Sequence, residues 1–195
     1  MPAIDVTIWY LEMLDPAALR PRRCDVAGWE VRRAAADPAI NREYYRRVGA
    51  DWQWTDRLSW PEGRWQTYVA QPGLETWIGY LDDEPVGYFE LLDGGAVGAD
   101  EGGQSHFSPR TPKNRDRPHE SAGGVEIAYF GLLPEFVGRG LGGALLSAAI
   151  ERAWARGPAR VWVHTCSLDH PQALANYQAR GMRVYKTETQ RQEIG

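Results

Sequence analysis

Cysteine is scarce in this chain of 195 residues, which contains only Cys24 and Cys166. Two cysteines are too few for a disulfide framework, so we expect a protein of the reducing cytoplasm. Long apolar runs are missing as well, since no stretch approaches the ~20 apolar residues that a membrane-spanning helix needs. Asp5 and Glu12 interrupt the N-terminal apolar run, which argues against a secretory signal peptide. The sequence therefore gives no reason to expect a membrane partner.

A surplus of basic residues is lacking too, because the net charge is −4 and Lys113 and Lys186 are the only lysines. This balance gives no general reason to expect nucleic acid or an anionic membrane as a partner. What the chain does contain is 43% hydrophobic residues and nine tryptophans, which indicates a folded globular protein. A chain of this length can form one sizeable core or two small ones, and we predict a single domain over residues 1–195.

Periodicity and turn residues predict a chain that contains both strands and helices. Residues 29–33 fit either a strand or the start of a helix, and Asn41 is a candidate N-cap. Residues 93–124 lack periodicity, so we expect a long flexible loop in which His106 and His119 are solvated. The other predicted strands cover residues 4–13, 74–81, 86–92, 125–132, 160–166 and 183–189, and the predicted helices cover residues 41–48, 61–70, 142–156 and 171–180.

The stretch from Val125 to Ala144 has the most distinctive pattern: an apolar strand, a turn at Pro134 and a glycine-rich bend, Gly138–Gly143, that opens a helix. Glycine lets the backbone turn sharply and approach a ligand closely. The first N–H groups of the following helix have no partner within the helix and, with the helix dipole, they favour an anion. The bend therefore predicts a site for a phosphate-bearing ligand at the end of the strand.

Two familiar phosphate-binding motifs fit this bend poorly. The dinucleotide fingerprint G-x-G-x-x-G should follow its strand directly and open a large parallel sheet, but residues 134–136 intervene and only about fifty residues follow. The P-loop requires Lys-Ser or Lys-Thr after its last glycine, and this chain has neither there. A dinucleotide-dependent oxidoreductase is thus disfavoured, and a purely structural glycine bend stays an alternative.

The bend closely resembles the acyl-coenzyme A site of the GNAT acetyltransferases, whose pattern is Gln/Arg-x-x-Gly-x-Gly/Ala. Gly140 and Gly142 take its two small positions, whereas Val137 stands where the family has Gln or Arg. This departure removes one side-chain contact to the diphosphate of coenzyme A. It leaves the cradle of backbone N–H groups, which is the larger part of such a site.

A second pattern of the same family, Asn-x-x-Ala-x-x-x-Tyr-x-x-x-Gly-Phe, follows at the expected distance. Ala173, Tyr177 and Gly181 fall on its Ala, Tyr and Gly positions. His170 stands at the position of its Asn, and Met182 at the position of its Phe. Two signatures in the right order make the resemblance more specific than either signature alone.

The resemblance covers residues 74–189 firmly and the first 70 residues loosely. It implies an α/β (α+β) fold with a single mixed, mostly antiparallel sheet of about six to seven strands, a central splayed parallel pair and helices on both faces. It also implies acetyl-CoA as the co-substrate, no metal, and direct attack by a primary amine of a small molecule or peptide in a ternary complex. It allows a homodimer. The cofactor-binding residues that it implies are Phe130, Leu132, Leu133, Val137, Gly138, Arg139, Gly140, Leu141, Gly142, Gly143, His170, Ala173 and Asn176.

Glu126 and Tyr177 are the candidate catalytic residues. Under the period-two rule Glu126 shares a strand face with Ala128, Phe130 and Leu132, and a lone carboxylate on an apolar face is costly to bury. Glu126 is either a paired or solvated group near a strand end, or a general base, the role that histone-type members of the family give this position. The resemblance places Tyr177 to donate a proton to the departing sulfur, and a core aromatic is the alternative. A backbone N–H near Leu132 is expected to hold the oxyanion.

Three tryptophans within nine residues, Trp52, Trp54 and Trp60, mark the connection between the first two predicted helices. They form either an aromatic plug that packs the first helix onto the sheet or a wall of the acceptor pocket. In the resembled family the acceptor lies near this connection, so Trp54, Asp56 and Arg57 are the implied substrate-binding residues.

A non-catalytic acyl-CoA sensor or a partner-regulating domain on the same fold is the main alternative to an enzyme, because Val137 and His170 depart from the family patterns. The candidate catalytic pair argues against a sensor. His164, in the middle of the strand predicted over residues 160–166, is expected to be a packed, hydrogen-bonded histidine.

Overall fold

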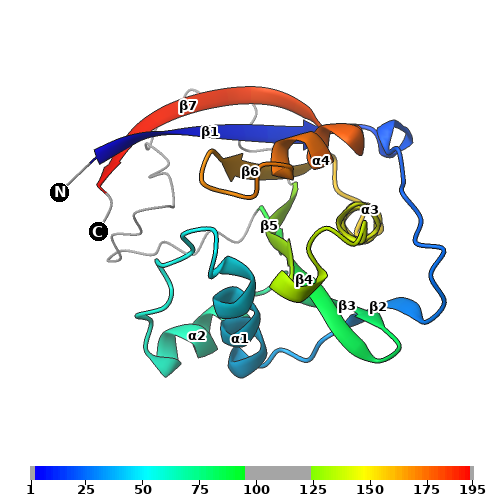
Figure 1. Ribbon diagram of the computed structural model, residues 1–195, viewed down its shortest axis with the longest axis horizontal. Helices are drawn as coiled ribbons and strands as arrows, with labels where there is room; N and C mark the ends of the chain where they lie inside the picture. The colour runs from blue at the N-terminus through cyan, green and yellow to red at the C-terminus, as the bar shows by residue number, and fades with distance from the viewer. Residues whose placement is uncertain (1–2, 95–123, 194–195) are drawn as a thin grey trace.

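The computed structural model describes residues 3–94 and 124–193. The loop predicted over residues 93–124 lies almost wholly outside this part of the chain. Within the described residues seven strands form one sheet in the order β2-β3-β4-β5-β6-β1-β7 (Figure 1). The strands are β1 Ala3–Met13, β2 Trp29–Arg33, β3 Glu75–Leu81, β4 Glu84–Asp93, β5 Val125–Leu132, β6 Val161–Cys166 and β7 Arg183–Glu193. The helices are α1 Pro38–Gly49, α2 Glu62–Val69, α3 Gly142–Trp154 and α4 Ala173–Ala179, with short 3₁₀ turns η1 Pro16–Ala18 and η2 Pro134–Phe136.

The sheet contains one parallel pair, β5 and β6, and all its other neighbours are antiparallel. The parallel strands pair only at Val125 with Val161 and at Glu126 with Trp162. Beyond Glu126 they diverge, so the edges of both strands face a gap. The predicted mixed sheet with a splayed central pair is confirmed.

Helices cover both faces of this sheet (Figure 1), as predicted. On one face Leu145 and Ile150 of α3 are fully buried in a core that also contains Tyr177 of α4. On the other face Tyr45 of α1 and Trp65 of α2 belong to an aromatic cluster. No helix in the described residues is long and apolar enough to cross a membrane.

A β-bulge in β5 changes which side chains share a face. The β4–β5 register shifts between Glu90 and Leu91, which pair with Tyr129 and Ile127, so Ala128 is the extra residue. Tyr129 packs against α1 and α2, whereas Phe130 packs on the side of α3. The prediction that Glu126 and Phe130 share one face is therefore wrong, because the bulge shifts the alternation by one residue.

The first helix begins earlier than the sequence suggested. Asp37 is the N-cap and its carboxylate accepts a hydrogen bond from Ala39 N, with Pro38 in the first turn. Asn41, the predicted cap, is fully buried inside α1, where its Nδ2 donates to Thr76 Oγ1 and Glu90 Oε1, each at 2.8 Å. Asp37 and Pro38 begin the helix more effectively than Asn41 would. The side-chain amide of Asn41 is therefore available to link α1 to the sheet.

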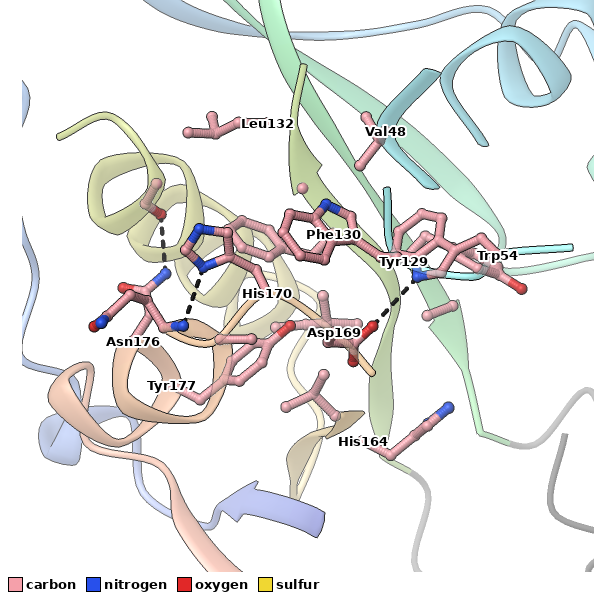
Figure 2. Close-up of a pocket in the computed structure, with 18 of the residues that line it drawn as sticks. Val48, Trp54, Tyr129, Phe130, Leu132, His164, Asp169, His170, Asn176 and Tyr177 are labelled. Atoms are coloured by element: carbon pink, nitrogen blue, oxygen red, sulfur yellow. Dashed lines mark hydrogen bonds between the residues drawn. The ribbon is translucent and has the colours of Figure 1, made fainter. Parts of the chain in front are cut away.

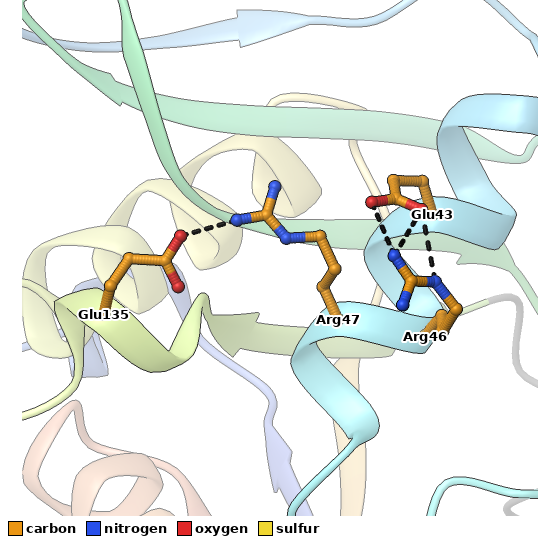
Figure 3. A network of polar contacts seen from close by, with 4 residues as sticks. All are labelled: Glu43, Arg46, Arg47 and Glu135. Carbon is orange, nitrogen blue, oxygen red and sulfur yellow. Dashed lines mark hydrogen bonds and ion pairs between the residues drawn. The ribbon is translucent and has the colours of Figure 1, made fainter.

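An ion pair joins α1 to the turn that precedes the glycine-rich bend (Figure 3). Arg47 Nη2 lies 2.5 Å from Glu135 Oε1, and the neighbouring Arg46 pairs with Glu43 within α1. Exposed pairs of this kind stabilise a fold by only about 0–1 kcal/mol each. The consequence of the Arg47–Glu135 pair is positional, since it helps to fix α1 beside the exit of β5.

Candidate active site

One large cavity occupies the gap between β5 and β6. Its volume is about 870 Å³, which falls within the range of about 300–1,000 Å³ that is usual for small-molecule sites. The cavity reaches both faces of the sheet because the two strands diverge. Its lining includes Gly140 and Tyr177 toward α3 and α4, and Tyr45, Trp54 and Arg57 toward α1 and α2. Two ligands entering from opposite faces can therefore meet at the edge of β5.

The glycine corner, residues Gly138–Gly143, forms one end of this cavity. Gly138 and Gly140 have φ of +82° and +79°, a conformation that suits glycine because it has no Cβ. The helix that follows has no side-chain cap. Among the described residues, the N–H groups of Gly138, Gly140, Leu141, Gly142 and Gly143 have no hydrogen-bond acceptor. Unpaired N–H groups at a helix start form a cradle for an anion.

The edge of β5 supplies backbone groups to the same cavity. Leu133 N donates to Val86 O at 2.9 Å across the β4–β5 ladder. Because hydrogen bonding alternates along an antiparallel pair, Gly131 also faces β4, whereas the N–H groups of Phe130 and Leu132 face the gap. The expectation of a backbone donor near Leu132 thus has a geometric basis.

Most of the predicted cofactor-binding residues line the cavity, and three do not. Leu133 and Leu141 are buried in a core cluster, and the guanidinium of Arg139 stacks over the Phe136 ring at 4.8 Å. Their side chains therefore point away from the cavity lining, and a contact of these three residues with a cofactor stays a prediction. The residues that line the cavity as predicted are Phe130, Leu132, Val137, Gly138, Gly140, Gly142, Gly143, His170, Ala173 and Asn176.

The turn before α4 differs from its prediction in detail. The helix is predicted over residues 171–180, but α4 begins at Ala173 with no side-chain cap. His170 Nδ1 instead accepts a hydrogen bond from Gln172 N at 3.0 Å. An asparagine oxygen makes the same kind of bond to the backbone two residues on, so His170 can substitute for the family's Asn in shaping this turn. Asn176 Nδ2 donates to Gly142 O at 3.3 Å and so ties α4 to the glycine corner.

Tyr177 lies beside Asp169 among the side chains that line the cavity (Figure 2). Its ring meets the ring of Phe130 edge-on, with centroids 6.0 Å apart. Burial, and then the negative charge of Asp169, raise the pKa of Tyr177 well above the usual tyrosine value. The phenol therefore keeps its proton at neutral pH and is available as a donor.

Glu126 faces the cavity from the point where β5 and β6 separate. Its Oε1 lies 3.4 Å from Nδ1 of His164 on β6, and both side chains are mostly buried. Burial alone lowers the pKa of His164, but the hydrogen bond and charge of Glu126 outweigh it and leave that pKa raised. The sequence identified Glu126 as a candidate but treated His164 as a packing residue, whereas His164 lines the cavity as well.

An aromatic pocket surrounds the predicted acceptor residues. The guanidinium of Arg57 lies over the rings of Trp60, Tyr68 and Tyr129 at 4.1–4.6 Å. Burial alone lowers the pKa of Arg57, but Tyr129, Tyr68 and the nearby Glu90 raise it more, so the group stays cationic. Trp54 and Trp60 thus pack in the aromatic cluster, and Trp52 and Trp54 line the cavity.

A buried carboxylate lies beneath this pocket. Glu90 on β4 is 1% exposed and accepts hydrogen bonds from Tyr68 and Asn41. Burial raises the pKa of Glu90, although Arg57 and the two donors act in the opposite direction. No sequence signal singled out Glu90, because its surroundings come from α1, α2 and the sheet together.

The loop between α1 and α2 crosses the cavity and contacts the loop before α4. Trp54 Nε1 donates to Asp169 Oδ1 at 3.3 Å (Figure 2), and the ring of Trp52 meets that of His170 at 5.0 Å. Asp169 is held in turn by Thr165 Oγ1 and by the N–H of Cys166, both of which donate to its Oδ2. The predicted acceptor residues and the predicted coenzyme residues therefore line one continuous space.

The described residues contain no group of three side chains arranged to hold a metal ion. The cavity lining offers hydrogen-bond donors, aromatic rings and the carboxyl groups of Asp56, Glu126 and Asp169.

Comparison of the sequence with protein families gives one match, to the Acetyltransferase (GNAT) family over residues 38–182. No curated protein matches the sequence.

Solved structures with the same fold are distant in sequence. One is a functionally unknown conserved protein from Staphylococcus epidermidis ATCC 12228 (TM-score 0.52, 14% identity, covering 96% of this chain and 61% of that one). A GCN5-related N-acetyltransferase from Kribbella flavida has a TM-score of 0.55 at 17% identity, covering 97% of this chain and 58% of that one. The aminoglycoside acetyltransferase meta-AAC0020 from an uncultured soil metagenomic sample, in complex with trehalose, gives 0.55 at 15% identity, with 78% and 87% covered. The chain thus spans little more than half the length of the first two.

Proposed function

The chain belongs to the acetyltransferase (GNAT) family, and we propose that it transfers an acetyl group from acetyl-CoA to a primary amine of a small molecule or peptide. The observation that carries the proposal is the single cavity that joins the glycine corner to a carboxylate-bearing aromatic pocket through the β5–β6 gap. Such a path brings a thioester and an amine together for direct attack in a ternary complex.

When bound, acetyl-CoA supplies the acyl group in activated form as a thioester. The unpaired N–H groups of the glycine corner would hold its diphosphate. The edge of β5, with the N–H groups of Phe130 and Leu132, would run along the rest of the carrier and orient the acyl carbonyl. Either N–H can donate to the oxygen that becomes negative during the reaction.

Glu126 is proposed to make the amine reactive. An alkylamine with a pKa near 10.4 is neutral in about one molecule in 2,500 at pH 7, which corresponds to about 4.6 kcal/mol. A carboxylate at the mouth of the gap can take the surplus proton, directly or through water. His164, whose Nδ1 lies 3.4 Å from Glu126 Oε1, can then share the positive charge of that proton with Glu126.

Tyr177 is proposed to protonate the departing sulfur. Its raised pKa keeps the phenol protonated, and its ring packs against Phe130 beside the strand edge where the thioester would lie. Trp54, Asp56 and Arg57 are proposed to contact the acceptor, since all three line the opposite part of the cavity.

The proposal predicts release of free thiol from acetyl-CoA when a suitable amine is added. A panel should contain an alkylamine, a polyamine, an amino acid, a peptide N-terminus and an aminoglycoside, because one similar structure is named an aminoglycoside acetyltransferase. The acetylated amine is then identified by mass spectrometry. Tight binding of coenzyme A with no thiol release across the panel would favour a sensor over an enzyme.

A further inference from the structure

The segment between β1 and β2 crosses the cavity mouth beside the glycine corner. Arg20 N donates to Arg180 O at 3.0 Å, and Arg22 N donates to Ser147 Oγ at 2.8 Å. Ser147 lies one turn beyond Gly143 on α3, and its hydroxyl also donates to Gly143 O at 2.8 Å. The backbone of Arg22 is thus held against the first turn of α3, which places its side chain over the corner.

Two arginine side chains converge on this corner. A Cβ added to Gly143 would lie 2.7 Å from Cδ of Arg22 and would also collide with Nη1 of Arg180. Arg22 Nη2 lies 3.6 Å from the corresponding position on Gly140. Both arginines line the cavity, one from the N-terminal segment and one from the end of α4. The absence of a side chain at Gly143 therefore leaves room for both arginine side chains.

Neither cation is balanced by a carboxylate within residues 3–94 and 124–193. In the part of the chain that the structure describes, no ion pair involves Arg22 or Arg180. Nε of Arg180 is buried there without an acceptor, and its Nη1 has a 3.4 Å contact with the neutral amide oxygen of Asn176. Desolvation, and then the charge of Arg22, lower the pKa of Arg180. Two repelling cations beside unpaired N–H groups favour a ligand with more than one negative charge.

We propose that Arg22 and Arg180 grip the diphosphate of the acyl carrier and replace the side chain that Val137 cannot supply. Val137 is 38% exposed at the corner and has no polar atom in its side chain. Guanidinium groups bind phosphate oxygens through paired hydrogen bonds, so two of them can serve both phosphates of a diphosphate. Arg22 lies outside the residues 38–182 that match the family, so this contact belongs to the chain's own N-terminal segment. The inference rests on the proposed function.

Calorimetric titration of coenzyme A tests the assignment without any turnover. We expect Arg22→Ala to weaken binding by about tenfold, the usual effect of one charge-assisted hydrogen bond, and Arg180→Ala to weaken it similarly. Arg23→Ala is the matched control, because Arg23 lies in the same exposed segment, carries the same charge and does not line the cavity. Melting curves of all variants show that each is folded, and Arg22→Lys should recover part of the affinity.

A second ligand separates the two phosphate groups of the carrier. With 3′-dephospho-coenzyme A as the ligand, Arg22→Ala should still bind about tenfold more weakly than the unaltered protein, since the diphosphate is still present. If both proteins bound 3′-dephospho-coenzyme A with the same affinity, Arg22 would contact the 3′-phosphate. The assignment to the diphosphate would then be overturned. Equal affinity for coenzyme A, or tighter binding by Arg22→Ala, would overturn it as well, the latter because the arginine would then be blocking the corner. Failure of the unaltered protein to bind coenzyme A would overturn the proposed function itself.

Discussion

Replacing Tyr177 by Phe should lower kcat for acetyl transfer by about 100-fold or more, the effect of removing a general acid, while coenzyme A affinity changes little. The hydroxyl lies at the end of a buried ring whose packing against Phe130 does not depend on the oxygen. Phe fills the same space, so the substitution removes the proton donor and keeps the cavity wall. Steady-state kinetics with acetyl-CoA and the best amine give kcat directly.

The matched control is Tyr44→Phe, which removes a tyrosine hydroxyl from α1. Tyr44 stacks on Tyr88 and does not line the cavity, so its replacement should leave kcat unchanged. If Tyr177→Phe were as active as the unaltered protein, Tyr177 would be a core aromatic and the acid assignment would be withdrawn. With an activated oxygen ester as the acetyl donor, the leaving group needs no proton. The unaltered protein and Tyr177→Phe should then transfer the acetyl group equally well.

Replacing Glu126 by Gln should lower kcat/KM for an alkylamine by about 100-fold at pH 7, because a general base has been removed. The deficit should shrink as the pH approaches the amine pKa of about 10.4, where the neutral amine is no longer rare. For an α-amine, whose pKa lies near 8, the deficit should already be small at mildly alkaline pH. Rates of both proteins across the pH range, with each type of amine, give the comparison.

Glu151→Gln serves as the control, since it makes the same charge change on the exposed side of α3, away from the cavity. A loss in Glu126→Gln that stayed constant at every pH would point to a structural role at the base of the β5–β6 gap. Such a result would leave the proton acceptor to another group that faces the cavity.

Local sequence signals sufficed for the parts of this protein that depend on local physics. Gly138 and Gly140 take positive φ as the bend requires, and Gly181 with φ +97° directly follows the helix predicted over residues 171–180. Trp29–Arg33 fitted a strand or a helix, and its pairing with β3 decides for the strand. Tyr177, which the second family pattern singled out, and Glu126, a lone carboxylate on an apolar strand, both line the cavity.

The bulge at Ala128 and the position of Arg22 could not be predicted in the same way. A bulge depends on how two strands pair, so period-two counting along β5 alone put Phe130 on the face of Glu126. Arg22 lies in a segment without periodicity, and its place over Gly143 results from hydrogen bonds to Ser147 and from the segment's path along α4. Contacts between distant segments set both features, and no single stretch of sequence records them.

The central claim is that unpaired amides of the glycine corner hold the carrier's diphosphate, and amide NMR during a titration with coenzyme A tests it most directly. The account predicts large shifts for the N–H signals of Gly138, Gly140, Gly142 and Gly143. It predicts unchanged signals for Gly63 in α2 and Gly157 beyond α3, neither of which lines the cavity. Unshifted corner amides at a coenzyme A concentration that saturates any binding seen by calorimetry would contradict the account.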